Sequence, residues 1–213
     1  MNKYHIAFYY SPEDSAYITC VPELPGCMAD GKTIQEALLN TESIVDDWLH
    51  FAKNDGRYIP KPLCIKHYSN ATSADVANYI LRKTGKITTL MLEKLTYYCK
   101  VWSLVWYGRS IIQESPEAWS NGPVFPRLYA QHTRKRFVTE SNIHTNHELS
   151  EDEKKFIDII VDVYGGFEAE ELKDITHREA PWRSARGQKS DNERSTEKIT
   201  DKAIIKYYQQ SKG

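Results

Sequence analysis

The sequence predicts an α+β protein built from two parts: a small domain with a β-sheet and one helix over residues 1–68, and an all-α domain over residues 69–213. Short runs of β-branched and aromatic residues near the start predict strands. From Ser73 onward the apolar residues instead recur at helical spacing. Between the two patterns lies the polar stretch Ser69–Thr72, which we interpret as the linker.

The composition is that of a globular protein. Of the 213 residues, 40% are hydrophobic and 12% are aromatic, which excludes a disordered chain. No apolar run approaches the ~20 residues that cross a bilayer, and the first residues lack the features of a signal peptide, so we expect a cytoplasmic protein. The net charge of −1 gives no general attraction to nucleic acid or to an anionic membrane.

In the first domain, two runs of strand-forming residues, 4–10 and 16–21, flank a turn and predict a β-hairpin. Residues 27–30 can add a third short strand. Thr33 and Glu36 then have the spacing of a capping box and begin a helix that ends near Gly56. Three strands cannot bury an apolar face alone, so we expect this helix to cross one face of the sheet.

Residues 59–68 predict either a final edge strand or an extended connector, because two prolines deny the segment backbone donors. The rest of the chain predicts helices only. The expected helices are 74–83 (capped by Ser73 and ended by Gly85), 88–107 (capped by Thr88), 123–134 (begun by Pro123), 156–164 (preceded by a Ser150/Glu153 capping box), 168–176 and 201–209.

No catalytic motif is present in the sequence. It has no glycine-rich phosphate loop, no G-x-S-x-G and no H-E-x-x-H, so we predict neither an enzyme nor a cofactor. The four cysteines (Cys20, Cys27, Cys64 and Cys99) form no C-x-x-C pair and predict no disulfide framework and no zinc site. His177 can serve as a general base, but holding a helix end or a loop is the commoner use of such a residue.

The densest basic run is short. His132 lies near Arg134, Lys135 and Arg136, without interleaved aromatic residues and in a chain of almost zero net charge. A solvated loop accounts for this run, and we do not predict a nucleic-acid partner.

Three segments of the first domain carry a resemblance. They are VPELPGCMADGKT (residues 21–33), the helix IQEALLN that follows, and DGRYIPKP (residues 55–62). With the two opening strands they make residues 3 to about 62 similar to the HicB antitoxin family. The resemblance implies an incomplete RNase-H-like fold that neutralises HicA toxins, which cleave RNA. HicB proteins usually continue into a DNA-binding helix-turn-helix or ribbon-helix-helix segment, and the continuation here differs.

Four ordered blocks carry a second resemblance: ITTLMLEKLTYYCKVW (residues 87–102), EAWSNGPVFPRLY (117–129), LSEDEKKFID (149–158) and LKDITHREAPWRSA (172–185). They make residues 73 to about 209 similar to the Panacea domain of SocA-type antitoxins. This resemblance implies a helical domain that pairs with varied toxins by direct contact and without a cofactor; one branch of the family serves as a protease adaptor.

The two resemblances together predict an antitoxin of a type II toxin–antitoxin system. The expected partner is a protein toxin, for instance an RNA-cleaving or nucleotide-transferring enzyme, which either domain can contact. Self-association through an edge of the first domain's sheet is a second expected contact. The alternatives are a DNA-binding autoregulator, a protease adaptor for the toxin, and a degenerate nuclease that needs added Mg²⁺ or Mn²⁺.

Two segments of the second domain can present aromatic and apolar groups to a toxin: the turn 119–124 and the loop 177–182. A packed turn and a packed core are the alternatives for these groups. The expected partner-binding residues are Trp119, Asn121, Gly122, Pro123, Val124, Tyr129, His177, Pro181 and Trp182 in the second domain, and Leu24, Pro25 and Cys27 in the first.

Overall fold

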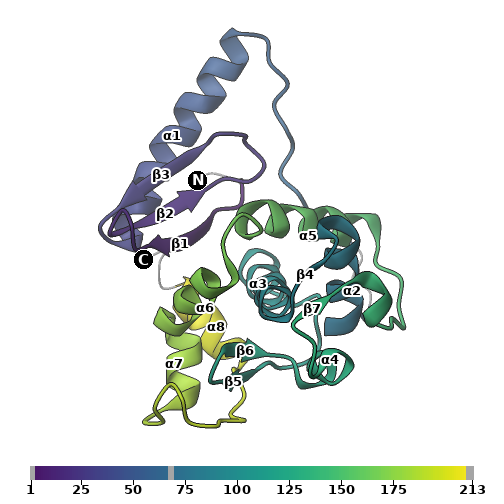
Figure 1. The fold of residues 1–213 in the computed structure, drawn as a ribbon. Helices are drawn as coiled ribbons and strands as arrows, with labels where there is room; N and C mark the ends of the chain where they lie inside the picture. The colour runs from purple at the N-terminus through teal and green to yellow at the C-terminus, as the bar shows by residue number, and fades with distance from the viewer. Residues whose placement is uncertain (1–2, 67–69, 210–213) are drawn as a thin grey trace. The chain divides into compact units, whose positions relative to one another are not determined.

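The computed structural model describes residues 3–66 and 70–209, which form an α+β protein with two compact units (Figure 1). The first unit is built on residues up to Cys64, and the second spans Ile65–Tyr208. The boundary predicted between residues 68 and 69 lies outside the described residues. The stretch from Ile59 to Lys66 contains no strand, so the described part of this segment is an extended connector.

The first unit contains a three-stranded antiparallel sheet of β1 (Ala7–Ser11), β2 (Ala16–Cys20) and β3 (Met28–Gly31), in that order. The predicted hairpin and third strand are therefore present. Helix α1 (Ile34–Asn54) begins at Thr33, whose side chain accepts a hydrogen bond from the backbone N–H of Glu36. The capping box is shifted by one residue, because the Glu36 carboxylate accepts from the backbone N–H of Lys32.

The core of the first unit lies between the sheet and α1. Val21, Leu24, Cys27 and Val45 pack together there. Backbone hydrogen bonds fold the Pro-rich loop into a compact turn that turns Leu24 and Cys27 inward: the N–H of Val21 donates to the Cys27 carbonyl at 2.9 Å. Between β2 and α1 the hydroxyl groups of Thr19 and Thr41 lie 2.5 Å apart, so these two buried polar groups satisfy each other.

The second unit is built around one central helix, α3 (Thr89–Tyr107), as Figure 1 shows. Every residue from Met91 to Val105 is buried, including Glu93, Lys94 and Lys100. A helix that is buried on all sides is the expected centre of an all-α domain. Within the described residues, no helix is both long enough and apolar enough to cross a membrane.

In the described residues of this unit, seven further helical segments and four short strands accompany α3. The helices are α2 (Ser73–Thr84), α4 (Pro126–His132), the 3₁₀ helix η1 (Glu140–Asn142), α5 (Glu151–Tyr164), α6 (Ala169–Arg178), α7 (Ala180–Arg186) and α8 (Asp201–Gln209). The strands pair as two antiparallel ladders: β4 (Ile87–Thr88) with β7 (Phe137–Val138), and β5 (Glu117–Trp119) with β6 (Gly122–Val124).

The described part of this unit differs from the sequence-based prediction in several places. Helices alone were predicted, and the four short strands β4 to β7 correct that prediction. Thr72, not Ser73, caps α2, in a reciprocal capping box with Asp75. Pro123 lies in β6, and the proline that begins the next helix is Pro126. Residues 177–182, predicted as a loop, instead form the end of α6 and the start of α7.

Gly31 allows β3 to lie close against the first turn of α1. A methyl group on Gly31 would lie 2.9 Å from the Cα of Ala37 and would touch its backbone nitrogen. We therefore expect Gly31→Ala to lower the free energy of unfolding of the first unit by about 2 kcal/mol, because backbone atoms must move apart. Hydrogen exchange of the β3 and α1 amides measures the effect. Gly166→Ala, where a methyl group meets nothing within 4 Å, is the control; equal protection in both variants contradicts the prediction.

Candidate functional site

Four aromatic rings of the second unit form one continuous set of contacts, which we call the ring cluster: Trp119, Tyr129, His177 and Trp182. The Trp119 and Tyr129 rings meet edge to face, with centroids 4.8 Å apart. The indole N–H of Trp182 donates to the Trp119 carbonyl at 3.0 Å. His177 stacks on Trp182, with centroids 3.9 Å apart and the rings 8° from parallel. The cluster therefore joins α4, α6, α7 and the β5–β6 hairpin.

The hairpin under the ring cluster is held by a buried lysine. The ammonium group of Lys94 on α3 donates to the Pro123 carbonyl at 3.0 Å. Burial lowers the pKa of Lys94 to about 7, against the raising effect of the neighbouring Glu93. Gly122 leaves room for this side chain: its φ is +94°, and a methyl group there would lie 2.7 Å from the Lys94 Nζ and 2.9 Å from the Thr176 Oγ1. The turn therefore requires glycine for both conformation and space.

A buried arginine holds the other strand of the hairpin. Arg186 at the end of α7 donates to the Ala118 carbonyl at 2.9 Å and to the Glu193 carbonyl at 2.7 Å, and it also donates to the Ser190 carbonyl. Its guanidinium lies 5.0 Å from the centre of the Trp182 ring. Arg186 thus fixes β5, the loop after α7 and the buried Trp182 ring of the cluster.

Glu179 lies where α6 turns into α7, between His177 and Trp182 in the sequence. It is buried, and the Tyr98 hydroxyl on α3 donates to its carboxylate at 3.0 Å. Burial raises the pKa of Glu179 to about 7, although hydrogen bonds from Tyr208 and Tyr98 act in the opposite direction. Burial likewise lowers the pKa of His177, opposed by Asp191. Near neutral pH, Glu179 is therefore only partly ionised, and the neutral form of His177 is favoured.

Glu93 on α3 holds both ends of α4. One carboxylate oxygen accepts from the backbone N–H of Phe125, the cap residue, at 2.9 Å, and the other lies 2.9 Å from the Nε2 of His132, the last residue of the helix. Tyr129 lies between these ends with 36% of its surface exposed, and its ring meets the His132 ring edge to face. The position of Tyr129 in the ring cluster thus depends on a buried carboxylate.

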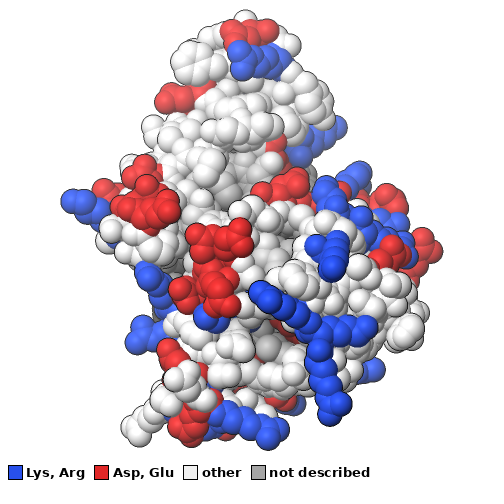
Figure 2. All heavy atoms as spheres, in the orientation of Figure 1, with Lys and Arg blue, Asp and Glu red and all other residues white. Residues whose placement is uncertain are grey.

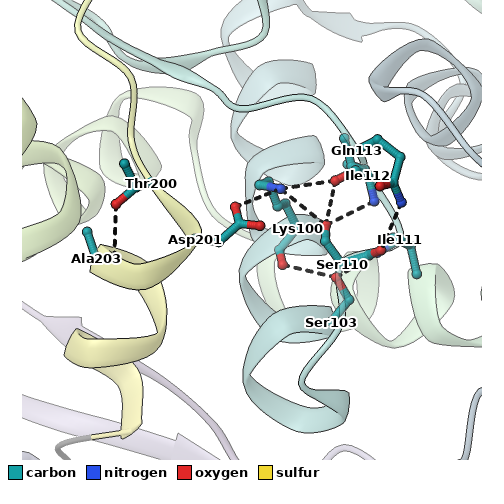
Figure 3. A network of polar contacts seen from close by, with 9 residues as sticks. All are labelled: Lys100, Ser103, Ser110, Ile111, Ile112, Gln113, Thr200, Asp201 and Ala203. Carbon is teal, nitrogen blue, oxygen red and sulfur yellow. Dashed lines mark hydrogen bonds and ion pairs between the residues drawn. The ribbon is translucent and has the colours of Figure 1, made fainter.

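A third charged group of α3, Lys100, holds the loop that leads to the hairpin (Figure 3). Its ammonium donates to the Ile112 carbonyl at 3.0 Å and pairs with Asp201, the first residue of α8, also at 3.0 Å. The Ser110 hydroxyl donates to the same Ile112 carbonyl at 2.6 Å. This network connects the loop and α8 to the centre of the unit.

The structure brings together most of the residues expected to bind a partner in the second domain, but at different depths. Asn121 is exposed at the tip of the hairpin, and Trp119, Tyr129 and His177 are partly exposed. The others are buried and support these side chains: Gly122, Pro123, Val124, Pro181 and Trp182, the last with 2% of its surface exposed.

In the first unit, the three expected residues differ in the same way. Leu24 and Cys27 belong to the core, each with 1% of its surface exposed, and Pro25 is exposed between them. The Pro25 carbonyl accepts a hydrogen bond from the indole N–H of Trp48 at 3.1 Å. The loop is therefore a packed turn whose exposed tip is Pro25.

Sequence reasoning did not identify the buried charged groups that shape this site. Glu93, Lys94 and Lys100 lie within a run of helix-forming residues, where charged side chains usually face solvent. The available signal was the breadth of the apolar face of this helix, which leaves little solvent-exposed surface for them. His132, grouped with the basic run in the sequence, is buried and belongs to this internal set.

The described residues contain no group of three or more His, Cys, Asp or Glu side chains arranged to hold a metal ion.

Burial raises the pKa of the Cys20 thiol to about 12 and raises that of Cys99 further. Both thiols therefore stay protonated at neutral pH, which makes them poor nucleophiles.

The pKa of Glu179 predicts a dependence of stability on pH. Because its pKa rises from 4.5 unfolded to about 7 folded, ionisation in the folded state is unfavourable, and the free energy of unfolding falls as pH rises through this window. Glu179→Gln stays neutral and still accepts from Tyr98. We expect the variant to gain stability over the wild type by on the order of 3 kcal/mol between pH 4.5 and 7.5. Urea unfolding at several pH values measures this; exposed Glu193→Gln is the control, and parallel curves for all three proteins contradict the prediction.

Comparisons with known proteins match both parts of the chain. Residues 4–89 match the family described as "HicB_like antitoxin of bacterial toxin-antitoxin system", and residues 92–183 match "Antitoxin SocA-like, Panacea domain". The first match extends past Cys64, so it includes the α2 segment of the second compact unit. The two antitoxin domains therefore follow each other along the chain in the order that the sequence predicts.

Individual relatives cover shorter stretches. UPF0150 protein Ta0767 of Thermoplasma acidophilum is 39% identical over 49 residues, which is 23% of this chain and 71% of that protein. An uncharacterized 14.9 kDa protein in the rep-hol intergenic region of Haemophilus phage HP1 is 32% identical over 57 residues, which is 27% of this chain and 43% of that protein. No solved structure matches the chain. The chain belongs to the HicB-like antitoxins through its N-terminal part and continues into a SocA-like Panacea domain.

Proposed function

We propose that this protein is a non-catalytic antitoxin that neutralises a partner toxin by direct contact, with the exposed part of the ring cluster as its anchor. The observation that carries the proposal is a chain of contacts within the SocA-like domain: Tyr129 meets Trp119, the Trp119 carbonyl accepts from the indole N–H of the buried Trp182, and His177 stacks on Trp182. Both domains of the chain match antitoxin families, which supports the role in general.

The build of the ring cluster suits an anchor for a protein partner. Aromatic side chains supply large contact areas at low cost in conformational entropy, and they dominate the binding energy when a partner removes them from water. Here Lys94, Arg186 and Glu93 hold the backbone of the segments that carry Trp119 and Tyr129, so these rings are already ordered before a partner arrives. A rigid surface loses less entropy on binding.

The candidate nucleophile of this region has no open access. Lys94, whose lowered pKa would suit an amine nucleophile, is completely buried and donates to the Pro123 carbonyl. Its position favours a structural role, in agreement with a protein that binds its partner without turning over a substrate.

The test pairs this protein with the toxin encoded by its neighbouring gene. We expect that gene alone to arrest growth, and co-expression of this protein to restore growth and yield a stable complex. Tyr129→Ala and Asn121→Arg should weaken the complex at least about tenfold, because they remove an anchor and place a charged side chain at the hairpin tip. Titration calorimetry with purified toxin measures the affinities.

The matched control is Tyr58→Ala in the HicB-like domain, since Tyr58 is an aromatic residue with 81% of its surface exposed. Wild-type affinity in this control supports the ring cluster as the anchor. If Tyr58→Ala loses affinity for the toxin while Tyr129→Ala and Asn121→Arg keep it, the contact belongs to the HicB-like domain and the proposal is contradicted. Disappearance of the toxin without a complex favours a protease adaptor instead.

A further inference from the structure

An exposed aromatic ring that is not part of the ring cluster lies among basic side chains at the β4–β7 ladder. Val138 in β7 is buried, and because side chains alternate along a strand, Phe137 points outward, with 45% of its surface exposed. In the orientation of Figure 1, Figure 2 shows Lys and Arg side chains gathered over the region where β4 and β7 lie.

Two cations lie directly against this ring. The Lys86 ammonium is 5.1 Å from the centre of the Phe137 ring, and the Arg136 guanidinium carbon is 5.5 Å from it. Arg134 and Lys135 are exposed on the adjoining turn. We call these four basic residues and Phe137 the cationic–aromatic surface.

The charges of this surface are not neutralised by neighbouring acids. Glu140 on η1 and Asp158 on α5 pair with Arg82 and Lys83, and the four cations of the surface form no ion pair within the part of the chain that the structure describes. Their charges are therefore available to an anionic ligand.

The backbone beneath these side chains is ordered. The N–H of Thr89 donates to the Arg136 carbonyl at 3.0 Å, and the N–H of Lys135 donates to the His132 carbonyl at 3.0 Å. Arg134 holds a φ of 63°, a conformation that costs an ordinary side chain about 1 kcal/mol and that glycine adopts freely. An arginine thus occupies a position where glycine would be the more stable choice, which directs attention to its charge.

We propose that the cationic–aromatic surface binds single-stranded nucleic acid. Single strands are bound by pairing cations with backbone phosphates and by stacking bases on aromatic rings or on arginine guanidinium planes. The surface offers both groups side by side. Duplex recognition needs a helix or ribbon that enters a groove, whereas these cations lie on a turn and a ladder of two-residue strands.

The three-dimensional arrangement changes what the sequence alone predicts. Residues 134–136 form a short basic run, but the β4 ladder adds Lys86 from 48 positions before Arg134, and the strand register turns Phe137 toward solvent. Acidic side chains of a peptide can supply anions to the same surface, but they carry no aromatic base to stack on the Phe137 ring.

The test measures binding of a fluorescent oligo-dT and an oligo-U to the full chain by anisotropy, at about 50 and 200 mM salt. We expect binding that weakens with salt. The triple variant Lys86→Ala, Lys135→Ala, Arg136→Ala should make the dependence on salt less steep. The negative slope of the logarithm of the binding constant against the logarithm of the salt concentration should shrink in magnitude by about two, at roughly 0.7 per lost phosphate contact. Phe137→Ala should weaken binding at least about fivefold, because a base loses its stacking partner.

The matched control removes three exposed lysines of the same unit, Lys155→Ala, Lys202→Ala and Lys206→Ala. It should keep the wild-type affinity and salt slope. No binding at the lower salt, an equal loss in the control, or tighter binding of polyglutamate than of either oligonucleotide overturns the proposal; the last outcome assigns the surface to an acidic protein. Preference for a duplex overturns it as well.

Circular dichroism verifies that each variant is folded. The triple variant should still bind the toxin, which keeps this test separate from the test of the antitoxin role.

Discussion

The second unit depends on one constraint: α3 is buried on all sides, yet it carries charged side chains. A charge in an apolar interior costs several kcal/mol unless it is paired or hydrogen-bonded. Glu93, Lys94 and Lys100 each meet this requirement with a group outside α3, on the α4 segment, on β6 and on the 110–113 loop. The helix therefore specifies the positions of segments that have little regular structure, because any other arrangement leaves a buried charge without a partner.

This constraint determines what the surface can present. An isolated helix of seven residues is unstable in water, so α4 needs tertiary support. Glu93 supplies it at both ends, through Phe125 and His132. Tyr129 of the ring cluster lies between these two points, and the basic turn of the cationic–aromatic surface begins directly after His132. One buried carboxylate therefore supports two surfaces with different chemistry.

Local patterns predicted much of the fold. The first hairpin, the cap at Thr33, α3 with its cap at Thr88 and the capping box at Ser150 all follow from short-range signals, and the structure confirms them. The two-residue and three-residue strands were not predicted, because so few residues show no alternation, and Pro123 was read as a helix start when the signal belonged to Pro126. The contact between Lys94 and Pro123, 29 positions apart, has no local signature. The aromatic residues of the candidate site were named from the sequence, but their depth depends on tertiary packing.

The difference between exposed and buried residues also means that the two proposed binding roles can be tested separately. Tyr129 and Asn121 on one side, and Phe137 with its cations on the other, are exposed groups whose removal leaves Glu93, Lys94 and Arg186 with all their partners. Substitution of a buried charge, in contrast, leaves its partner unsatisfied and disturbs every segment that it holds. The two surfaces share supports but no exposed side chain, and α4, which carries Tyr129 and precedes the basic turn, is held at both ends by the same carboxylate.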